Sequence, residues 1–193
     1  MNDGPNTPDA PDASAPANRP ATDEHTDSQA QVVAAQLGRE PRDPWRVSSR
    51  CRWGYPTTIA SPSLLADGTP FPNLVWLTCP YLIDRIGRLE SSGMAAEYAQ
   101  HAAEDEWFAE SLKETDARLR AARADESGGT DACPDVGLAG QKDPLGVKCL
   151  HAHVALALVH LGDPIGRDVL DHVGYQCSDR RCEKYLASWS EKP

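Results

Sequence analysis

The sequence predicts an α+β fold, in which a mainly helical domain packs on a small antiparallel β-meander and follows a disordered acidic tail. Three observations lead to this prediction. Short runs rich in Trp, Val, Ile and Thr alternate with turn signals between residues 45 and 78, as short strands do. Most of the later sequence spaces its apolar residues three and four apart, as in amphipathic helices. Residues 1–28 contain five prolines and almost no large apolar side chain, so they cannot offset the entropy cost of ordering.

We expect two units, a tail over residues 1–28 and one α+β domain over residues 29–193. The predicted strands cover residues 45–53, 57–60 and 74–78. The predicted helices cover residues 28–38, 80–93, 94–124, 146–161 and 163–174, with one more from residue 178. Gly38 and Gly174 mark helix ends, and the prolines that follow Cys79 and Asp163 mark helix starts.

The charge is uneven along the chain, whose formal net charge is −10. Residues 1–30 hold six acidic residues against one arginine, and residues 95–126 hold nine against four basic residues. Because there is no basic stripe, nucleic acid is not an expected partner. No run reaches the roughly 18 apolar residues of a membrane span, and no signal-peptide pattern opens the chain. We therefore expect a cytoplasmic protein whose six cysteines are thiols or metal ligands before disulfides.

The segment over residues 146–161 is the most apolar run and also the richest in candidate ligands. Among its leucines and valines it carries Cys149, His151, His153 and His160. On a helix, Cys149 and His153 stand four residues apart on one face. This spacing can chelate one metal ion.

Two more cysteines can complete a structural zinc site, which takes four Cys or His ligands. Cys51 and Cys79 lie at the two ends of the predicted meander. An iron–sulfur cluster draws on the same thiols, but no usual cluster spacing is present, so zinc is the expected metal and iron the less favoured one. Cys177 and Cys182 form a further candidate ligand pair, but they are interpreted as surface thiols or a facultative disulfide before metal ligands, and Cys133 is placed in a loop.

Two other functions stay open. A cysteine at a helix N-terminus has a lowered pKa and forms thiolate at neutral pH. The position of Cys79 at a predicted helix start therefore indicates a thiol enzyme or redox switch centred on this residue, with His151 or His153 as the base. Alternatively, the cysteines are only core residues, and the protein is a metal-free module that binds a protein partner. No phosphate-binding loop, nucleophile elbow or zinc-protease motif is present, so no reaction is predicted.

Four blocks of the sequence resemble one bacterial family. They are QLGREPR, RCRWGYPTTI, LADGTPFPNLVWLTCPYL with IGRLESSG, and GVKCLHAHVALAL. Over residues 36–173 they are similar to domain-of-unknown-function family five hundred and one. The resemblance implies a small soluble bacterial protein without an established activity, often encoded beside a septum-formation initiator and an exopolyphosphatase. That context links the interaction-module alternative to cell division or envelope growth.

The resemblance also selects among the candidate ligands. The family blocks contain four of the candidate ligands, and the resemblance favours these four as the ligands of a structural or regulatory zinc site. They are Cys51, Cys79, Cys149 and His151. The sequence departs from the family at Leu156, where similar proteins carry a histidine. His153 therefore competes as the fourth ligand.

Overall fold

The computed structural model describes residues 26–190, so most of the tail predicted over residues 1–28 lies outside the described part. Residues 26–28 belong to the start of the first helix, α1 (Asp27–Leu37). Thr26 caps this helix, because its hydroxyl accepts from the Gln29 amide while the Gln29 side chain accepts from the Thr26 amide. This reciprocal capping box pairs two amides that would otherwise be unsatisfied.

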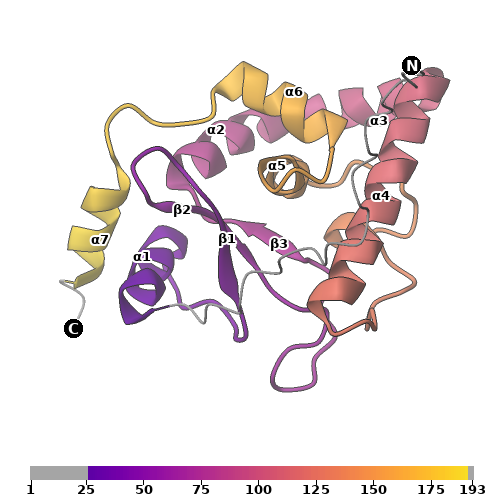
Figure 1. Ribbon diagram of the computed structural model, residues 1–193. Coiled ribbons are helices and arrows are strands. Elements are labelled where there is room, and N and C mark those ends of the chain that lie inside the picture. The colour runs from indigo at the N-terminus through magenta and orange to yellow at the C-terminus, as the bar shows by residue number, and fades with distance from the viewer. Residues whose placement is uncertain (1–25, 191–193) are drawn as a thin grey trace, which may run out of the picture.

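The structure confirms the predicted antiparallel meander. Strands β1 (Arg46–Arg50), β2 (Pro56–Ala60) and β3 (Val75–Leu77) pair in the order β1-β2-β3 (Figure 1). Ile59 of the central strand lies opposite Val47 on one side and Trp76 on the other. All residues of β2 are buried.

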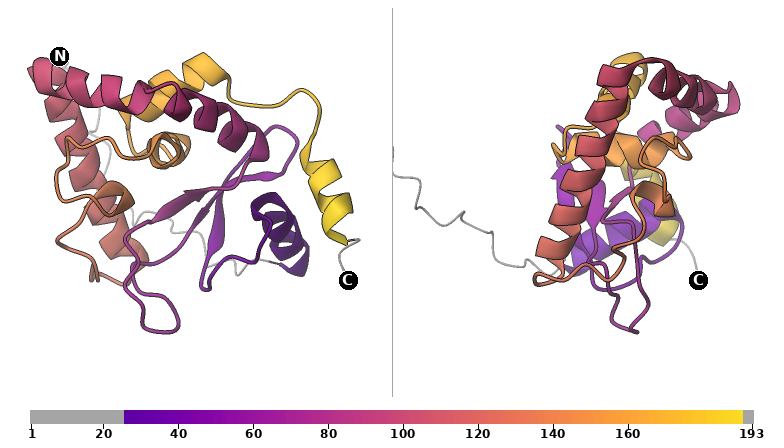
Figure 2. Two further views of the ribbon diagram at one scale, coloured as in Figure 1. Left: turned by 180° about the vertical axis from the view of Figure 1, so that it is seen from behind. Right: turned by 90° about the vertical axis from the view of Figure 1, so that its right-hand side faces the viewer.

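Helices surround this sheet and make up most of the described chain. After α1 they are α2 (Pro80–Ser91), α3 (Met94–Glu104), α4 (Glu106–Glu126), the short 3₁₀ turn η1 (Leu138–Gly140), α5 (Leu150–Leu158), α6 (Pro164–Val173) and α7 (Cys182–Ser190). The long α4 stands on one side of the molecule, and α1 and α7 lie side by side on the other, as Figure 1 and Figure 2 show.

The single helix predicted over residues 94–124 is two helices in the structure. Asp105 adopts an extended conformation (φ −117°, ψ 108°) and caps α4, its carboxylate accepting from the Phe108 amide at 2.9 Å. Aspartate favours this position because its short side chain competes for backbone amides at helix starts. The chain can therefore turn between α3 and α4.

Helix α5 is shorter than the predicted segment over residues 146–161 and lies at the centre of the fold. It begins only at Leu150, because Cys149 is an extended N-cap residue (φ −151°, ψ 109°). Leu150 and Val154 are completely buried, with α6 on one side of the helix and the sheet on the other (Figure 1). A Cβ atom at Gly166 of α6 would lie 2.1 Å from the His153 carbonyl oxygen, so these two helices approach unusually closely.

The alternation of side chains along β3 separates two cores. Val75 and Leu77 belong to the main core, together with Leu150 of α5. Trp76 packs instead against the smaller core that includes Val33 of α1. Successive strand side chains point to opposite faces, so α5 and α1 cover the two faces of the sheet.

The loop after α4 is anchored by a completely buried arginine. Arg123 donates to the Asp131 carboxylate at 2.6 Å and to the carbonyl oxygens of Cys133 and Val136 at 2.7 and 2.8 Å. Its other terminal nitrogen donates to the Pro72 carbonyl at 2.9 Å. One side chain thus joins α4 to two separate loops. No helix between residues 26 and 190 combines the length and the apolar character needed to cross a membrane.

Candidate metal centre

Three side chains of different chemistry converge where the end of α2 meets the start of α5. The potential ligand atoms of Glu90, Cys149 and His151 all lie within 4.8 Å of one another. His151 Nδ1 is at the centre of the group, 3.1 Å from Glu90 Oε1 and 3.9 Å from Cys149 Sγ. We call this group the α2–α5 site.

Local structure explains why these side chains meet. Cys149 is the N-cap of α5, and His151 stands in its first turn. Glu90 reaches across from the last turn of α2, and its Oε1 also accepts from the Leu150 amide at 2.6 Å. A carboxylate is stabilised at a helix N-terminus because it pairs with free amides and with the positive end of the helix dipole.

The hydrogen bond of His151 Nε2 determines whether His151 Nδ1 carries a proton or a lone pair. His151 Nε2 lies 3.1 Å from the carbonyl oxygen of Ile83, and a carbonyl only accepts, so Nε2 carries a proton. In a neutral ring, Nδ1 would then present a lone pair to the Glu90 carboxylate. Two acceptors at 3.1 Å repel each other unless a cation lies between them. The contact therefore requires a cation between the two atoms, either a proton or a metal ion.

The electrostatics of His151 agree with this requirement. Burial opposes the charged imidazolium, but hydrogen bonds to Cys149 and Ile83, together with the Glu90 carboxylate, raise the pKa of His151 to about 9. The site is also open on one side, since the side chains of His151 and Glu90 keep 24% and 29% of their surface exposed. A small ion therefore has access from solvent.

His153 lies on the other side of α5 and joins a different group. Residues two apart on a helix point about 200° apart, so His151 and His153 cannot share a face. His153 Nδ1 lies 2.8 Å from Asp163 Oδ2, and both side chains are almost completely buried. The prediction that Cys149 and His153 share one helix face is therefore wrong. The helix starts only after Cys149, so the helical spacing does not apply to it.

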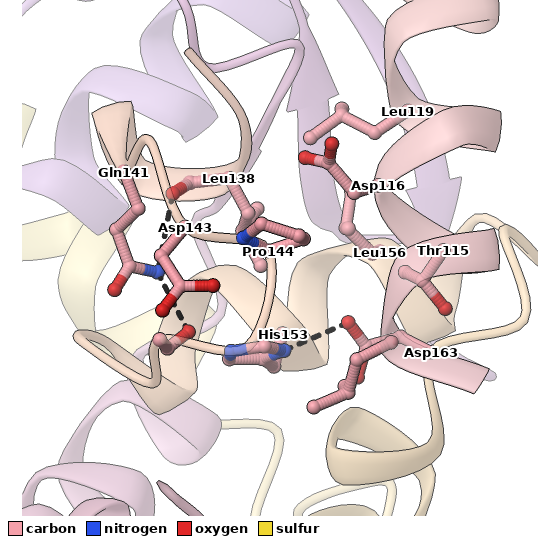
Figure 3. A pocket seen from close by; sticks show the side chains of 12 residues that line it. Thr115, Asp116, Leu119, Leu138, Gln141, Asp143, Pro144, His153, Leu156 and Asp163 are labelled. Atoms are coloured by element: carbon pink, nitrogen blue, oxygen red, sulfur yellow. Dashed lines mark hydrogen bonds and ion pairs between the residues drawn. The ribbon is translucent and has the colours of Figure 1, made fainter. Parts of the chain in front are cut away.

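The second nitrogen of His153 faces a small cavity, which Figure 3 shows beside the His153–Asp163 hydrogen bond. His153 Nε2 is buried and has no hydrogen-bond partner among the described residues. The cavity measures about 20 Å³ and is lined by residues that include Asp116, Asp143 and Thr115. This volume is enough for one water molecule.

Cys51 and Cys79, the other two predicted ligands, lie at the β1–β2 turn and at the N-cap of α2. Neither belongs to the group of ligand atoms within 4.8 Å in the part of the chain that the structure describes. Cys79 is only 5% exposed. Burial raises the pKa of its thiol, and the amides of Leu82 and Tyr81 do not reverse the change. The lowered pKa expected from the helix start is therefore wrong, and the thiol-enzyme alternative loses its main support.

Glu90 was not among the candidate ligands predicted from the sequence. It is one acidic residue near a helix end, a position that carries no metal-binding spacing with Cys149, 59 positions later. The only available signal is its place in the IGRLESSG block.

Comparisons with known proteins place the chain in a family without assigning an activity. Neither the curated proteins nor the solved structures include one that matches the chain. A protein-family pattern described as "Protein of unknown function (DUF501)" matches residues 47–171. The matched region contains Glu90, Cys149 and His151 as well as the whole sheet apart from its first residue. The chain therefore belongs to the DUF501 family of proteins of unknown function.

Proposed function

We propose that this protein binds one divalent metal ion, zinc before iron, through Glu90, Cys149 and His151. The observation that carries the proposal is the orientation of His151, whose Nε2 is held by the Ile83 carbonyl while Nδ1 faces a sulfur and a carboxylate oxygen. Histidine ligands of metals commonly donate their second N–H to a carbonyl or carboxylate, which fixes the ring and its tautomer.

The distances suit a zinc ion. Tetrahedral zinc with bonds of about 2.0–2.3 Å separates its ligand atoms by about 3.3–3.6 Å. The two separations from His151 Nδ1, 3.1 Å to Glu90 and 3.9 Å to Cys149, lie on either side of that range. One sulfur, one nitrogen and one oxygen also suit zinc better than magnesium or calcium, which prefer oxygen ligands.

The proposed ion would have three protein ligands and one position open to water. This differs from the closed set of four expected from the sequence, because Glu90 takes part in place of Cys51 and Cys79. An ion at this position joins the end of α2 to the start of α5, which supports a structural or regulatory role. The open position, on the exposed side of the site, also leaves room for an external ligand.

Metal content and affinity test the proposal. The reduced, metal-free full chain is loaded with zinc, and zinc per chain and the dissociation constant are measured for Cys149→Ser, His151→Gln and Glu90→Gln. The side-chain oxygen of glutamine in Glu90→Gln can still accept from the Leu150 amide. A change in zinc binding therefore does not come from loss of the hydrogen bond at the start of α5. Each variant is expected to lose one zinc equivalent or to bind it at least about tenfold more weakly.

The matched controls are Cys133→Ser, His172→Gln and Glu97→Gln, whose side chains lie outside the α2–α5 site. They should bind zinc as the unaltered chain does. If the three ligand variants also keep the zinc content and affinity of the unaltered chain, the proposal is wrong. An unaltered chain that binds no zinc at all would favour the metal-free interaction module.

A further inference from the structure

Four of the six cysteines gather around the β1–β2 turn, away from the α2–α5 site. We call Cys51, Cys79, Cys177 and Cys182 the thiol cluster. The first lies in the turn itself, the second at the start of α2, and the last two in the segment that leads into α7 and at its first residue. Figure 1 and Figure 2 both show this turn beside the start of α2 and the connection from α6 to α7.

Hydrogen bonds attach the cluster to the segment over residues 53–57. The Cys51 amide donates to the Tyr55 carbonyl at 2.9 Å, and the Cys79 amide donates to the Thr57 carbonyl at 3.4 Å. The Cys177 carbonyl accepts from the indole N–H of Trp53 at 3.1 Å. Three cysteines that are distant in sequence are therefore fixed to one short turn.

Gln36 of α1 connects the fourth cysteine to the same place. Its side-chain nitrogen donates to the Pro56 carbonyl at 2.9 Å and to Cys182 Sγ at 3.3 Å. Gln36 is buried, and its side-chain oxygen has no partner among the described residues. An N–H group that donates to a cysteine sulfur is the kind of contact that supports a metal-bound thiolate.

The cluster is mostly buried, which makes isolated thiolates unfavourable there. Cys79, Cys177 and Cys182 are only 5%, 7% and 5% exposed. Metal binding deprotonates cysteine ligands, and the bound cation offsets the cost of burying their negative charge.

Positive charge stands at the rim of the cluster. The guanidinium groups of Arg52 and Arg180 each lie 4.4 Å from the ring centre of Trp53, whose N–H holds Cys177. Four thiolates around one zinc ion carry a net charge of −2. The Arg52 guanidinium can offset part of that excess charge, whereas Arg180 already pairs with the Glu183 carboxylate at 3.7 Å.

We propose that Cys51, Cys79, Cys177 and Cys182 form a second metal site, which binds zinc through four thiolates. Soft thiolate ligands select zinc over magnesium or calcium. Within the described residues the sulfurs are not gathered as closely as the ligands of the α2–α5 site, so binding draws them together. Rotation of a cysteine between staggered conformations moves its sulfur by about 3 Å. The bound ion fastens α7 and the chain leading to it onto the β1–β2 turn and α2.

Cobalt titration of the reduced, metal-free full chain tests this site. Cobalt bound by thiolates gives a near-ultraviolet charge-transfer band whose intensity grows with the number of sulfurs. The unaltered chain should give the strong band of a four-sulfur site, and Cys149→Ser should keep it. Cys51→Ser and Cys182→Ser should weaken it or remove it, whereas the control Cys133→Ser, another buried cysteine, should not.

Zinc counting separates this proposal from the proposed function. Two zinc ions are expected in the unaltered chain, one in Cys149→Ser, and one in Cys182→Ser. If the α2–α5 site fails, Cys149→Ser keeps the metal content of the unaltered chain while Cys182→Ser still loses one ion. A chain without the strong cobalt band, or a band that Cys51→Ser and Cys182→Ser leave intact, overturns the four-thiolate site.

Proteolysis gives a readout that does not depend on the variants folding. Arg180 and Arg181 stand between the last two cysteines of the cluster. Zinc should slow tryptic cleavage at these two residues in the unaltered chain by at least about tenfold at saturation, because cleavage requires local opening. Equal cleavage rates with and without zinc contradict the proposal.

Discussion

Substitution of Asp163 by alanine should destabilise this protein much more than an ordinary lost helix cap. The two oxygens of Asp163 have separate partners. Oδ1 accepts from the Gly166 amide at 2.7 Å and caps α6, while Oδ2 lies 2.8 Å from His153 Nδ1. Asp163 is 1% and His153 4% exposed, so bulk water does not reach either contact.

The expected cost follows from these two contacts. Loss of an N-cap costs about 1 kcal/mol, and a buried donor left without a partner costs about 1–3 kcal/mol. Asp163→Ala should therefore lower the free energy of unfolding by about 2–4 kcal/mol. For a chain of this size each kcal/mol lowers the melting temperature by about 2–4 °C, which gives a fall of about 4–16 °C.

Asp105 offers a matched control within the same chain. It caps α4 as Asp163 caps α6, and it also faces a histidine, His101, at 3.5 Å, but both side chains are about half exposed. Urea unfolding of Asp105→Ala should show the loss of a cap alone. A loss of stability in Asp163→Ala no larger than that in Asp105→Ala would refute the buried hydrogen bond as a source of stability.

Three further predictions concern other contacts. Arg123→Ala should cost about 3–5 kcal/mol in urea unfolding, because it removes the buried cation that pairs with the Asp131 carboxylate and donates to three carbonyls; Arg88→Ala, an exposed control, should change little, and equal effects would contradict this role. Gly166→Ala should cost about 1–3 kcal/mol or more, because its methyl group would overlap the His153 carbonyl; an unchanged melting temperature would show that α5 and α6 separate easily. In metal-free protein, His151 has a pKa raised from 6.5 to about 9, so its stabilising effect is complete below pH 6.5 and is lost as the pH rises through 9. The stability difference between the unaltered chain and His151→Gln should shrink over that range, and a constant difference would be inconsistent with a protonated His151.

Local sequence patterns determine most of the fold of this chain. The three strands and most helix boundaries follow from apolar spacing, glycine and proline, because these features act over a few residues. Asp105 shows the limit of such patterns. The apolar spacing of residues 94–124 continues through it, but its carboxylate gains more as a cap than as a helical residue.

The site was less predictable because it depends on contacts between distant segments. Cys149 and His151 were recognised as candidate ligands, yet their partner Glu90 comes from another helix. A helical wheel paired Cys149 with His153, and this failed because the helix begins one residue after Cys149. Cys51 and Cys79 were expected to join Cys149, but only tertiary structure shows that their neighbours are the cysteines near the C-terminus.

Helix α2 has a consequence that extends beyond either site. Cys79 precedes its first residue and Glu90 lies in its last turn, about 16 Å apart at 1.5 Å per residue. The two proposed ions would thus bind at opposite ends of one rigid helix. If an ion at one end shifts the helix, and the other site binds its ion with different affinity in the two positions, the two affinities are coupled. Linkage is reciprocal, so the factor is the same in both directions, and α2 would serve as an allosteric connection between the two ions.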